Sequence, residues 1–476
     1  MSSFIKWFKE IGIKDVEEVG GKNASLGEMY NHLTPLGVNV PNGFAVTAKA
    51  YNHYLDINNL WEPLKKLFEN FNPEDIDELK AVGKAARKMI IEAEIPDDLK
   101  EEILKGYEKL KEEYGEDVSL AVRSSATAED SPTASFAGQN ETYLNIKGEK
   151  NLLWAYKMCI ASNFTDRSIS YKYTHSFDPL KVYLSVTVMK MVRSDKGSSG
   201  VMFSIDTETG FRDVVFINAA WGLGENIVQG TIDPDAFYVH KPTFKKGKKA
   251  VLKRKLGSKE MMMVFSETLE KANLAEQFTK NIKTPIEKRM KFAITDDEIL
   301  KLADWAIKIE EHYTNVRGTY TPMDMEWAKD GIDGKLYMVQ ARPETVHSQE
   351  KINEFEIYRL LEKGKVLVTG NAVGEKIGAG RVKILKSMAE ADKFNEGDVL
   401  VAHTTSPDWE PVMKKASAIV TETGGRTCHA AIVSRELGKP AIVGAKDATK
   451  ILKENQEVTV SCAEGEIGKV YEGILK

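Results

Sequence analysis

The sequence lacks the features that mark membrane, secreted and nucleic-acid-binding proteins. No stretch approaches the roughly 18 uninterrupted apolar residues of a membrane helix, and the N-terminus carries no secretory signal pattern. Cysteine is scarce, since Cys159, Cys428 and Cys462 are widely spaced and form neither a metal-ligand pattern nor a disulfide framework. The net charge is only −5, so nothing points to nucleic acid or an anionic membrane. We therefore expect a cytoplasmic protein with reduced thiols that binds neither nucleic acid nor membrane.

The composition is that of a folded protein with several domains. The 476 residues are 42% hydrophobic and 29% charged, which is typical of globular chains and predicts two to four domains. A polar stretch without strand signals, 346–365, precedes a compact run of short strands and glycines. We predict a large α/β domain over 1–345, a linker over 346–365 and a small β-rich domain over 366–476.

Periodicity predicts the main elements of the large domain. Apolar residues at helical spacing fill Asn72–Gly115, and Pro96 divides this stretch into two helices. Runs of β-branched and apolar residues predict strands, the last two joined by a tight turn, over Val118–Ser125, Thr142–Ile146, Lys181–Val192, Asp213–Gly222, Asp324–Lys329 and Lys335–Thr345.

One histidine of the small domain stands where a strand turns into a helix. Gly424 and Gly425 allow a sharp turn, and apolar spacing predicts a helix that begins near His429 and ends at Gly438. Free N–H groups and the positive end of the helix dipole suit an anion attached to the imidazole, and they favour a neutral, nucleophilic ring. Arg426 adds forked donors for phosphoryl oxygens. A capping or solvent-facing histidine remains the alternative from these residues alone, and Cys428 is better explained as a packing residue than as a reactive thiol.

The run Gly424–Gly444, GGRTCHAAIVSRELGKPAIVG, closely resembles the phosphohistidine motif of the phosphoenolpyruvate synthases, the pyruvate, water dikinases. His403–Glu422 resembles the same domain. The resemblance implies that His429 carries a phosphoryl group between two distant sites, within a small swivelling β/β/α domain. One departure is Glu422–Thr423, where synthases often have Asn and a basic residue. We expect it to alter docking of the small domain rather than its phosphorylation.

Three segments of the large domain suit a polyphosphate. Glycines and Lys22 precede a helical pattern, and Arg123 ends a buried strand that leads into a long loop of small residues. Asp324 and Glu326 share one strand face, and Gln340 and Arg342 share another, which suits Mg²⁺ with phosphates. Taken singly, a helix-starting turn, a mobile surface loop and a salt-bridged hairpin are the alternatives.

Together these segments resemble the ATP-grasp nucleotide-binding domain of the same dikinase family. Position by position, the resemblance implies ATP and Mg²⁺ as cofactors. It implies phosphate-binding roles for Lys22, Arg123 and Arg342, nucleotide contacts from the lid loop at Gly138 and Thr142, and metal binding at Glu326 and Gln340. The catalytic set is then His429, Arg342 and Arg123.

Further departures from the family pattern concern the strand expected to lie beside adenine and the C-terminal end of the chain. Met189 replaces the family's usual Gln, and extra residues precede Pro322. The family's synthases also carry a barrel that binds pyruvate, and the last residues here resemble the end of the phosphohistidine domain. We expect this chain to hold the ATP half-reaction and the carrier, and to reach pyruvate through a barrel domain or separate subunit. A dikinase for another acceptor, or a phosphocarrier or regulatory subunit, is the alternative, and a homo-oligomer stays open.

Overall fold

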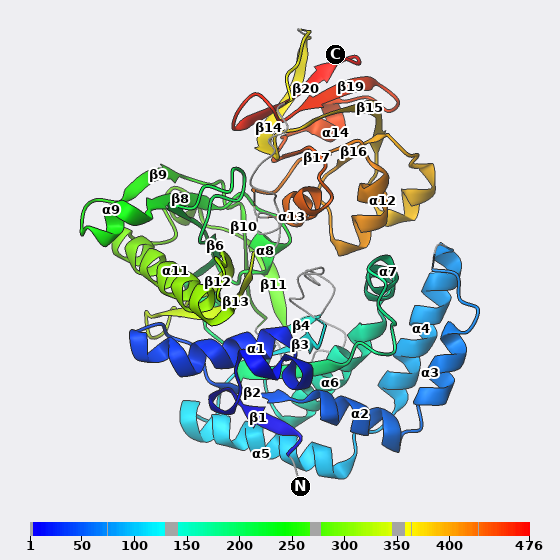
Figure 1. Cartoon of the computed structure of the whole chain (residues 1–476), viewed down its shortest axis with the longest axis vertical. Coiled ribbons are helices and arrows are strands. Elements are labelled where there is room, and N and C mark those ends of the chain that lie inside the picture. The colour runs from blue at the N-terminus through cyan, green and yellow to red at the C-terminus, as the bar shows by residue number, and fades with distance from the viewer. Residues whose placement is uncertain are drawn as a thin grey trace. The chain divides into compact units, whose positions relative to one another are not determined.

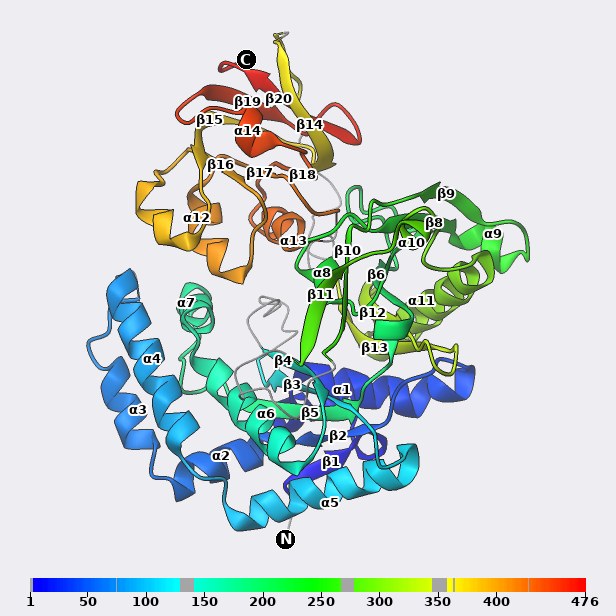
Figure 2. The ribbon, with the colours of Figure 1, turned by 180° about the vertical axis from the view of Figure 1, so that it is seen from behind.

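The computed structural model describes residues 3–73, 75–128, 141–266, 278–344, 358–362, 364–426 and 428–476 (Figures 1 and 2). The chain divides into two compact units. The first unit comprises Met1–Arg193, Val264–Lys280 and Met325–Pro343, and the second comprises Ser194–Met263, Asn281–Asp324 and Glu344–Lys476. This contact-based division differs from the predicted domain boundaries, which stay predictions, and most of the predicted linker lies outside the described residues.

The first unit is built on an antiparallel five-stranded sheet. Its order is β1 (Ile5–Trp7), β2 (Gly43–Val46), β5 (Leu184–Lys190), β3 (Leu120–Ala126) and β4 (Thr142–Ile146). All seven residues of β3 are buried, because neighbours pair with it on both sides and helices cover its faces. The strands predicted at β3, β4 and β5 are thereby confirmed.

Helices enclose this sheet. Their bounds are α1 (Val16–His32), α2 (Ala48–Ile57), α3 (Trp61–Phe68), α4 (Ile76–Glu92), α5 (Asp97–Tyr114), α6 (Glu149–Ala161) and α7 (Asp166–Thr174). In Figures 1 and 2, α1 lies on one side of the strands and α5 on the other. The predicted helical pair is confirmed as α4 and α5. Asp75 caps α4 by accepting hydrogen bonds from two backbone N–H groups, and Pro96 is the N-cap residue of α5.

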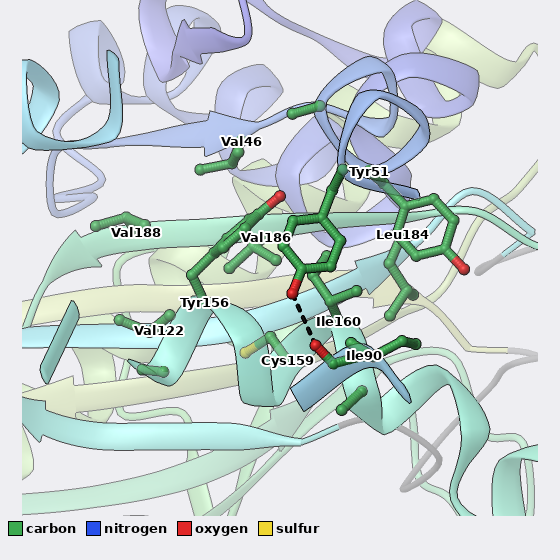
Figure 3. Close-up of a cluster of buried hydrophobic side chains, with 14 of the residues drawn as sticks. Val46, Tyr51, Ile90, Val122, Tyr156, Cys159, Ile160, Leu184, Val186 and Val188 are labelled. Carbon is green, nitrogen blue, oxygen red and sulfur yellow. Dashed lines mark hydrogen bonds between the residues drawn. The ribbon is translucent and has the colours of Figure 1, made fainter. Parts of the chain in front are cut away.

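The core of the first unit is a continuous cluster of aromatic and branched side chains from the sheet and helices. Figure 3 shows Tyr51, Tyr156 and Cys159 packed with valines of the sheet. The unit also contains β13 (Leu336–Pro343) and most of β12 (Met323–Lys329). These two strands are neighbours in a sheet, as predicted, and the predicted turn joins them.

The first part of the second unit is a run of four neighbouring strands with short helices. The strands are β6 (Ser198–Phe203), β7 (Val214–Trp221), β8 (Asp235–His240) and β9 (Val251–Lys255). The helices are α8 (Glu225–Val228), α9 (Lys241–Lys245), α10 (Ile286–Arg289) and the long α11 (Asp296–Arg317), and β10 (Met261–Phe265) pairs with β11 (Thr279–Lys283). The extra residues before Pro322 form the last turns of α11 and a loop that begins at Gly318, in the left-handed conformation.

The C-terminal part of the second unit is a closed β-barrel, drawn from yellow to red in Figure 1. Its strand order is β14 (Val366–Val373), β18 (Ala441–Val443), β17 (Ala418–Thr421), β16 (Val399–Ala402), β15 (Ile377–Ile384), β19 (Glu457–Ser461) and β20 (Ile467–Glu472). The helices α12 (Glu410–Lys415), α13 (His429–Glu436) and α14 (Ala448–Ile451) accompany it. Within the described residues, no helix is long and apolar enough to cross a membrane.

Candidate active site

His429 is the first residue of α13, as the sequence predicted. The preceding β17 is fully buried, and the turn between them uses Gly424 at φ +104°, a conformation that favours glycine. Gly438 follows the helix at φ +63° and ends it in the left-handed conformation. The imidazole is therefore placed by a short helix whose two ends are fixed by glycine turns.

The His429 side chain is nearly enclosed, with 8% of its surface exposed, and its ring is oriented by a threonine. The Nδ1 atom lies 3.1 Å from Oγ1 of Thr405, which is itself buried. Thr405 stands in the loop that follows β16, inside the stretch that resembled the phosphohistidine domain. No role for Thr405 was predicted, although its Thr-x-Pro-Asp-Trp context was an available signal.

Cys428 and Arg426 flank the histidine with different chemistry. Cys428 is buried, and burial raises the pKa of its thiol to about 11, although the N–H groups of Ala431 and Ala430 act in the opposite direction. This agrees with a packing role for the thiol. Arg426 keeps its charge, because Glu208 and Tyr238 raise the pKa of its guanidinium against the effect of burial.

Glu422, the main departure from the family pattern, is tied into the barrel. Its carboxylate accepts hydrogen bonds from the N–H and the hydroxyl of Thr449 at 2.9 and 2.5 Å, and it lies 2.7 Å from Nδ1 of His403. Burial raises the pKa of Glu422, but the contacts with Thr449 and His403 outweigh it and the net shift is downward. Glu422 thus has a role inside the barrel, and its effect on docking stays a prediction.

In the first unit, the glycines before Lys22 bring α1 against β3. Gly20 interrupts the helix at φ +75°, and a Cβ there would lie 2.3 Å from Oγ and 2.4 Å from the carbonyl oxygen of Ser125. The N–H of Asn23 also donates to the Ser125 hydroxyl at 3.3 Å. Lys22 therefore stands beside the strand that carries Arg123. Burial raises the pKa of the Cys159 thiol, and the positive charges of Lys22 and Arg123 act in the opposite direction.

Arg123 is a buried cation, 7% exposed, at the meeting of three strands. Its Nη1 donates to the carbonyl oxygen of Val339 in β13 at 3.3 Å, and its Cα is the register partner of Thr142 in β4. Side chains directly opposite in an antiparallel pair share a face, so Thr142 and Arg123 lie together. Gly138, the other predicted lid residue, lies outside the described residues.

Of the two strands predicted to hold metal and phosphates, β12 alternates as expected through Trp327, and β13 alternates only through Gln340. In β12, Asp324 and Glu326 are partly exposed between buried neighbours. In β13, Gln340 is buried at 5% and Arg342 is partly exposed. The Ser25 hydroxyl of α1 donates to the carbonyl oxygen of Ala341 at 2.5 Å. The helix α1 thus contacts both β3 and β13. These three elements carry Lys22, Arg123, Gln340 and Arg342.

Unpartnered buried atoms mark this region as suited to a polar ligand. Among the described residues, Nε of Arg123 and Oε1 of Gln340 are buried without a hydrogen-bond partner, which is costly unless a ligand completes the site. The amide oxygen of Gln340 and the carboxylate of Glu326 are the hard oxygen donors that Mg²⁺ prefers, and Mg²⁺ usually takes few protein ligands together with phosphates. The described residues contain no cluster of three or more His, Cys, Asp or Glu side chains for a metal.

Met189, expected beside the adenine, lies buried in the middle of the five-stranded sheet. It pairs with Gly43 in β2 and with Ala121 in β3, and only 2% of it is exposed. Its predicted effect on adenine contacts stays a prediction.

Two protein families match parts of the chain. Residues 16–360, more than half of the chain, match the family described as pyruvate phosphate dikinase, AMP/ATP-binding domain. Residues 394–465 match the PEP-utilising enzyme, mobile domain.

Proteins named phosphoenolpyruvate synthase are similar along the whole chain. The one from Aquifex aeolicus is 53% identical over 477 residues, covering 99% of this chain and 55% of the relative. The ones from Helicobacter pylori and Escherichia coli are 52% and 49% identical, covering 99% and 100% of this chain and 58% of each relative. The chain spans little more than half the length of these relatives. Because its larger match covers more than half of the chain, the chain belongs to the pyruvate phosphate dikinase AMP/ATP-binding domain family.

Proposed function

We propose that this chain is an ATP-dependent phosphotransferase of the phosphoenolpyruvate synthase type. ATP phosphorylates His429, AMP and phosphate are released, and the phosphohistidine serves transfer to pyruvate. The observation that carries the proposal is the buried imidazole of His429 at the start of a helix, fixed through Nδ1 by Thr405. Membership of an ATP-binding family supports the donor, and the names of the relatives support the acceptor.

In the proposed reaction Nδ1 stays with Thr405 and Nε2 is the reacting nitrogen. When Nδ1 carries the proton and donates it to Oγ1 of Thr405, the lone pair of the neutral ring is on Nε2. Nε2 then attacks the β-phosphorus of ATP, and the bond from that phosphorus to the oxygen bridging it to the α-phosphorus breaks. AMP leaves with the bridging oxygen, and His429 holds a pyrophosphoryl group. Water then removes the outer phosphate and leaves phosphohistidine.

The first unit supplies the charges that this step needs. Lys22, Arg123 and Arg342 bind phosphate oxygens, and Thr142 and Gly138 contact the nucleotide. Glu326 and Gln340 would hold Mg²⁺, which neutralises charge on the polyphosphate. The buried guanidinium of Arg123 and the unpartnered amide oxygen of Gln340 support these roles.

A dikinase for another acceptor would use the same ATP site. A phosphocarrier subunit would need no ATP site. Three features favour a working ATP site over a carrier alone. They are the buried guanidinium of Arg123, the buried amide oxygen of Gln340 without a hydrogen-bond partner, and the helix α1 that Gly20 interrupts. The predicted cytoplasmic location and any homo-oligomer stay predictions.

The test is formation of AMP from ATP and Mg²⁺ by the full chain. An arginine that acts on the transition state contributes about 2–4 kcal/mol, so Arg342→Ala is expected to slow AMP formation on the order of 10²–10³-fold. Lys335→Ala removes an exposed cation from the same hairpin and serves as the matched control. A loss below about threefold at saturating ATP places Arg342 outside the site.

A further inference from the structure

Within the second unit, the barrel and the segment Ser194–Met263 have separate hydrophobic cores. One cluster is confined to the segment and contains Val201, Phe216 and Ile232, whereas two other clusters contain barrel residues only. Salt bridges and hydrogen bonds from Glu208, Tyr238, Lys253 and Lys255 join the two parts. Contacts of this kind are typical of interfaces that form and release.

Glu208, in the segment, is a nearly enclosed charge in these contacts. Its side chain is 10% exposed, its Oε1 forms an ion pair with Nη2 of Arg435, and the same oxygen lies 3.9 Å from Nε of Arg426. Its Oε2 accepts the N–H of Gly374 at 3.0 Å. One carboxylate thus meets three groups of the barrel. Two of them are guanidinium groups, 8% and 15% exposed, on either side of His429 in the sequence.

Close backbone contacts surround this ion pair. A Cβ added to Gly230 would lie 2.1 Å from Cβ of Cys428, and one added to Gly425 would lie 3.2 Å from Cδ of Pro234. Arg426 also donates to the carbonyl oxygen of Glu466 at 3.3 Å, and its Nη1 lies 3.5 Å from the Tyr238 hydroxyl. The glycine turn before His429 therefore rests on the segment.

The loop that receives this turn is anchored at Asp235. Asp235, next to Pro234, is fully buried and forms an ion pair with the buried Lys259. The same carboxylate accepts the N–H groups of Gly257 at 2.9 Å and Ala293 at 2.8 Å. A carboxylate held at both oxygens fixes the C-terminal end of the loop Gly230–Asp235.

We propose that Glu208 is the anchor of a reversible docking surface, formed by Glu208 and the loop Gly230–Asp235, whose partner is the turn and helix that carry His429. Loss of the carboxylate leaves two nearly buried guanidinium groups without their anion, which strongly favours release of the barrel. Glu208 is a positioning residue in this account, and the proposal does not depend on phosphorylation of His429.

The reactivity of the Cys428 thiol reports release of the barrel from the docking surface. The thiol is buried in one barrel core cluster and Gly230 of the segment covers its Cβ, whereas Cys159 lies in the first unit and Cys462 lies in the other barrel core cluster. Undocking removes the cover of Gly230 from Cys428, and global unfolding uncovers all three cysteines. We would therefore measure the rate of alkylation of each cysteine in the full chain, without nucleotide, by peptide mass spectrometry.

The expected result is alkylation of Cys428 at least about tenfold faster in Glu208→Gln than in the native chain, with unchanged rates at Cys159 and Cys462. Glu208→Asp, which keeps the charge, restores part of the protection. Glu464→Gln is the matched control, because its contacts with Lys469 and Tyr471 lie within the barrel. Equal Cys428 rates in Glu208→Gln, Glu464→Gln and the native chain overturn the proposal, as does parallel acceleration at all three cysteines.

Discussion

At the residue scale, the hydroxyl of Thr405 contacts Nδ1 of His429 and orients the imidazole ring. The contact of 3.1 Å joins two buried side chains, so the ring has a fixed orientation before the nucleotide binds. An imidazole held in place avoids the entropy loss of orienting it at the moment of reaction.

Replacing Thr405 with Val keeps the shape of the side chain and removes the partner of Nδ1. We expect phosphorylation of His429 to slow about tenfold or more, because ring orientation and tautomer are no longer fixed. Thr405→Ser retains a hydroxyl and should recover most of the rate in quench-flow measurements of protein-bound phosphate. Equal rates for the Val and Ser variants would exclude an orienting role for Thr405.

Glu422 links barrel stability to pH. Its pKa is lowered in the folded chain, so its stabilising contribution is fully present above the unfolded value, about 4.3, and is lost as pH falls through the folded value. Glu422→Gln should lower the free energy of unfolding of the barrel by about 1 kcal/mol at pH 6.

Chemical denaturation at pH 6 and at pH 3.5 measures this linkage. The difference between the native chain and Glu422→Gln should shrink at the lower pH, where the native carboxylate is increasingly protonated. A difference that is constant or grows as pH falls is inconsistent with a depressed pKa.

Single residues also show what a sequence can and cannot reveal about the site. His429 stood out because glycines and a helical pattern surround it, and the structure places it at the predicted helix start. Thr405 is 24 residues away, and only the pairing of β16 with β17 brings its loop beside the histidine. Glu208 is 221 residues away, and nothing in its neighbourhood marks it. Contacts between distant residues depend on the tertiary fold, which local patterns do not contain.

At the element scale, the interruption of α1 joins two predicted phosphate-binding segments. Gly20 leaves the helical conformation where β3 approaches, and Lys22 begins the uninterrupted part of the helix. A helix start beside a strand end is a frequent setting for phosphate groups.

Gly20→Ala is therefore expected to disrupt both the fold and the site. Its Cβ would meet backbone atoms of Ser125 that cannot move aside, so we expect a loss of about 2–4 kcal/mol in the stability of the first unit. Gly37→Ala is the matched control, with φ +89° and no atom within 4 Å of the added Cβ, and should cost only about 1 kcal/mol. Equal losses in thermal denaturation would show that the contact with Ser125 is unimportant.

Helices and strands with strong periodicity could be predicted from the sequence. The closure of the C-terminal strands into a barrel could not be predicted. The helical pair α4 and α5, the buried strand β3 and the short helix α13 follow from spacing and capping residues. The sequence showed short strands after residue 366, but barrel closure depends on β14 pairing with both β18 and β20. Such pairings join segments up to about a hundred residues apart, beyond the reach of any local signal.

At the scale of the whole molecule, separate hydrophobic clusters predict separate unfolding. The barrel clusters share no residue with the cluster of the five-stranded sheet. Calorimetry should therefore resolve more than one transition. Glu422→Gln should shift only the barrel transition, and Gly20→Ala only that of the first unit. A single transition shifted by both variants would mean that the chain unfolds as one cooperative body.

Labelled nucleotide is the decisive measurement for the proposed phosphorylation of His429 by ATP. The full chain is incubated with Mg²⁺ and ATP labelled at either the β- or the γ-phosphorus, and the modified peptide is mapped. We expect the β-label to stay on His429 as an acid-labile, base-stable group, the γ-label to be released as phosphate, and His429→Ala to take up neither label. Retention of β-label in His429→Ala, or its mapping to another residue in the native chain, would exclude His429 as the phosphorylated residue.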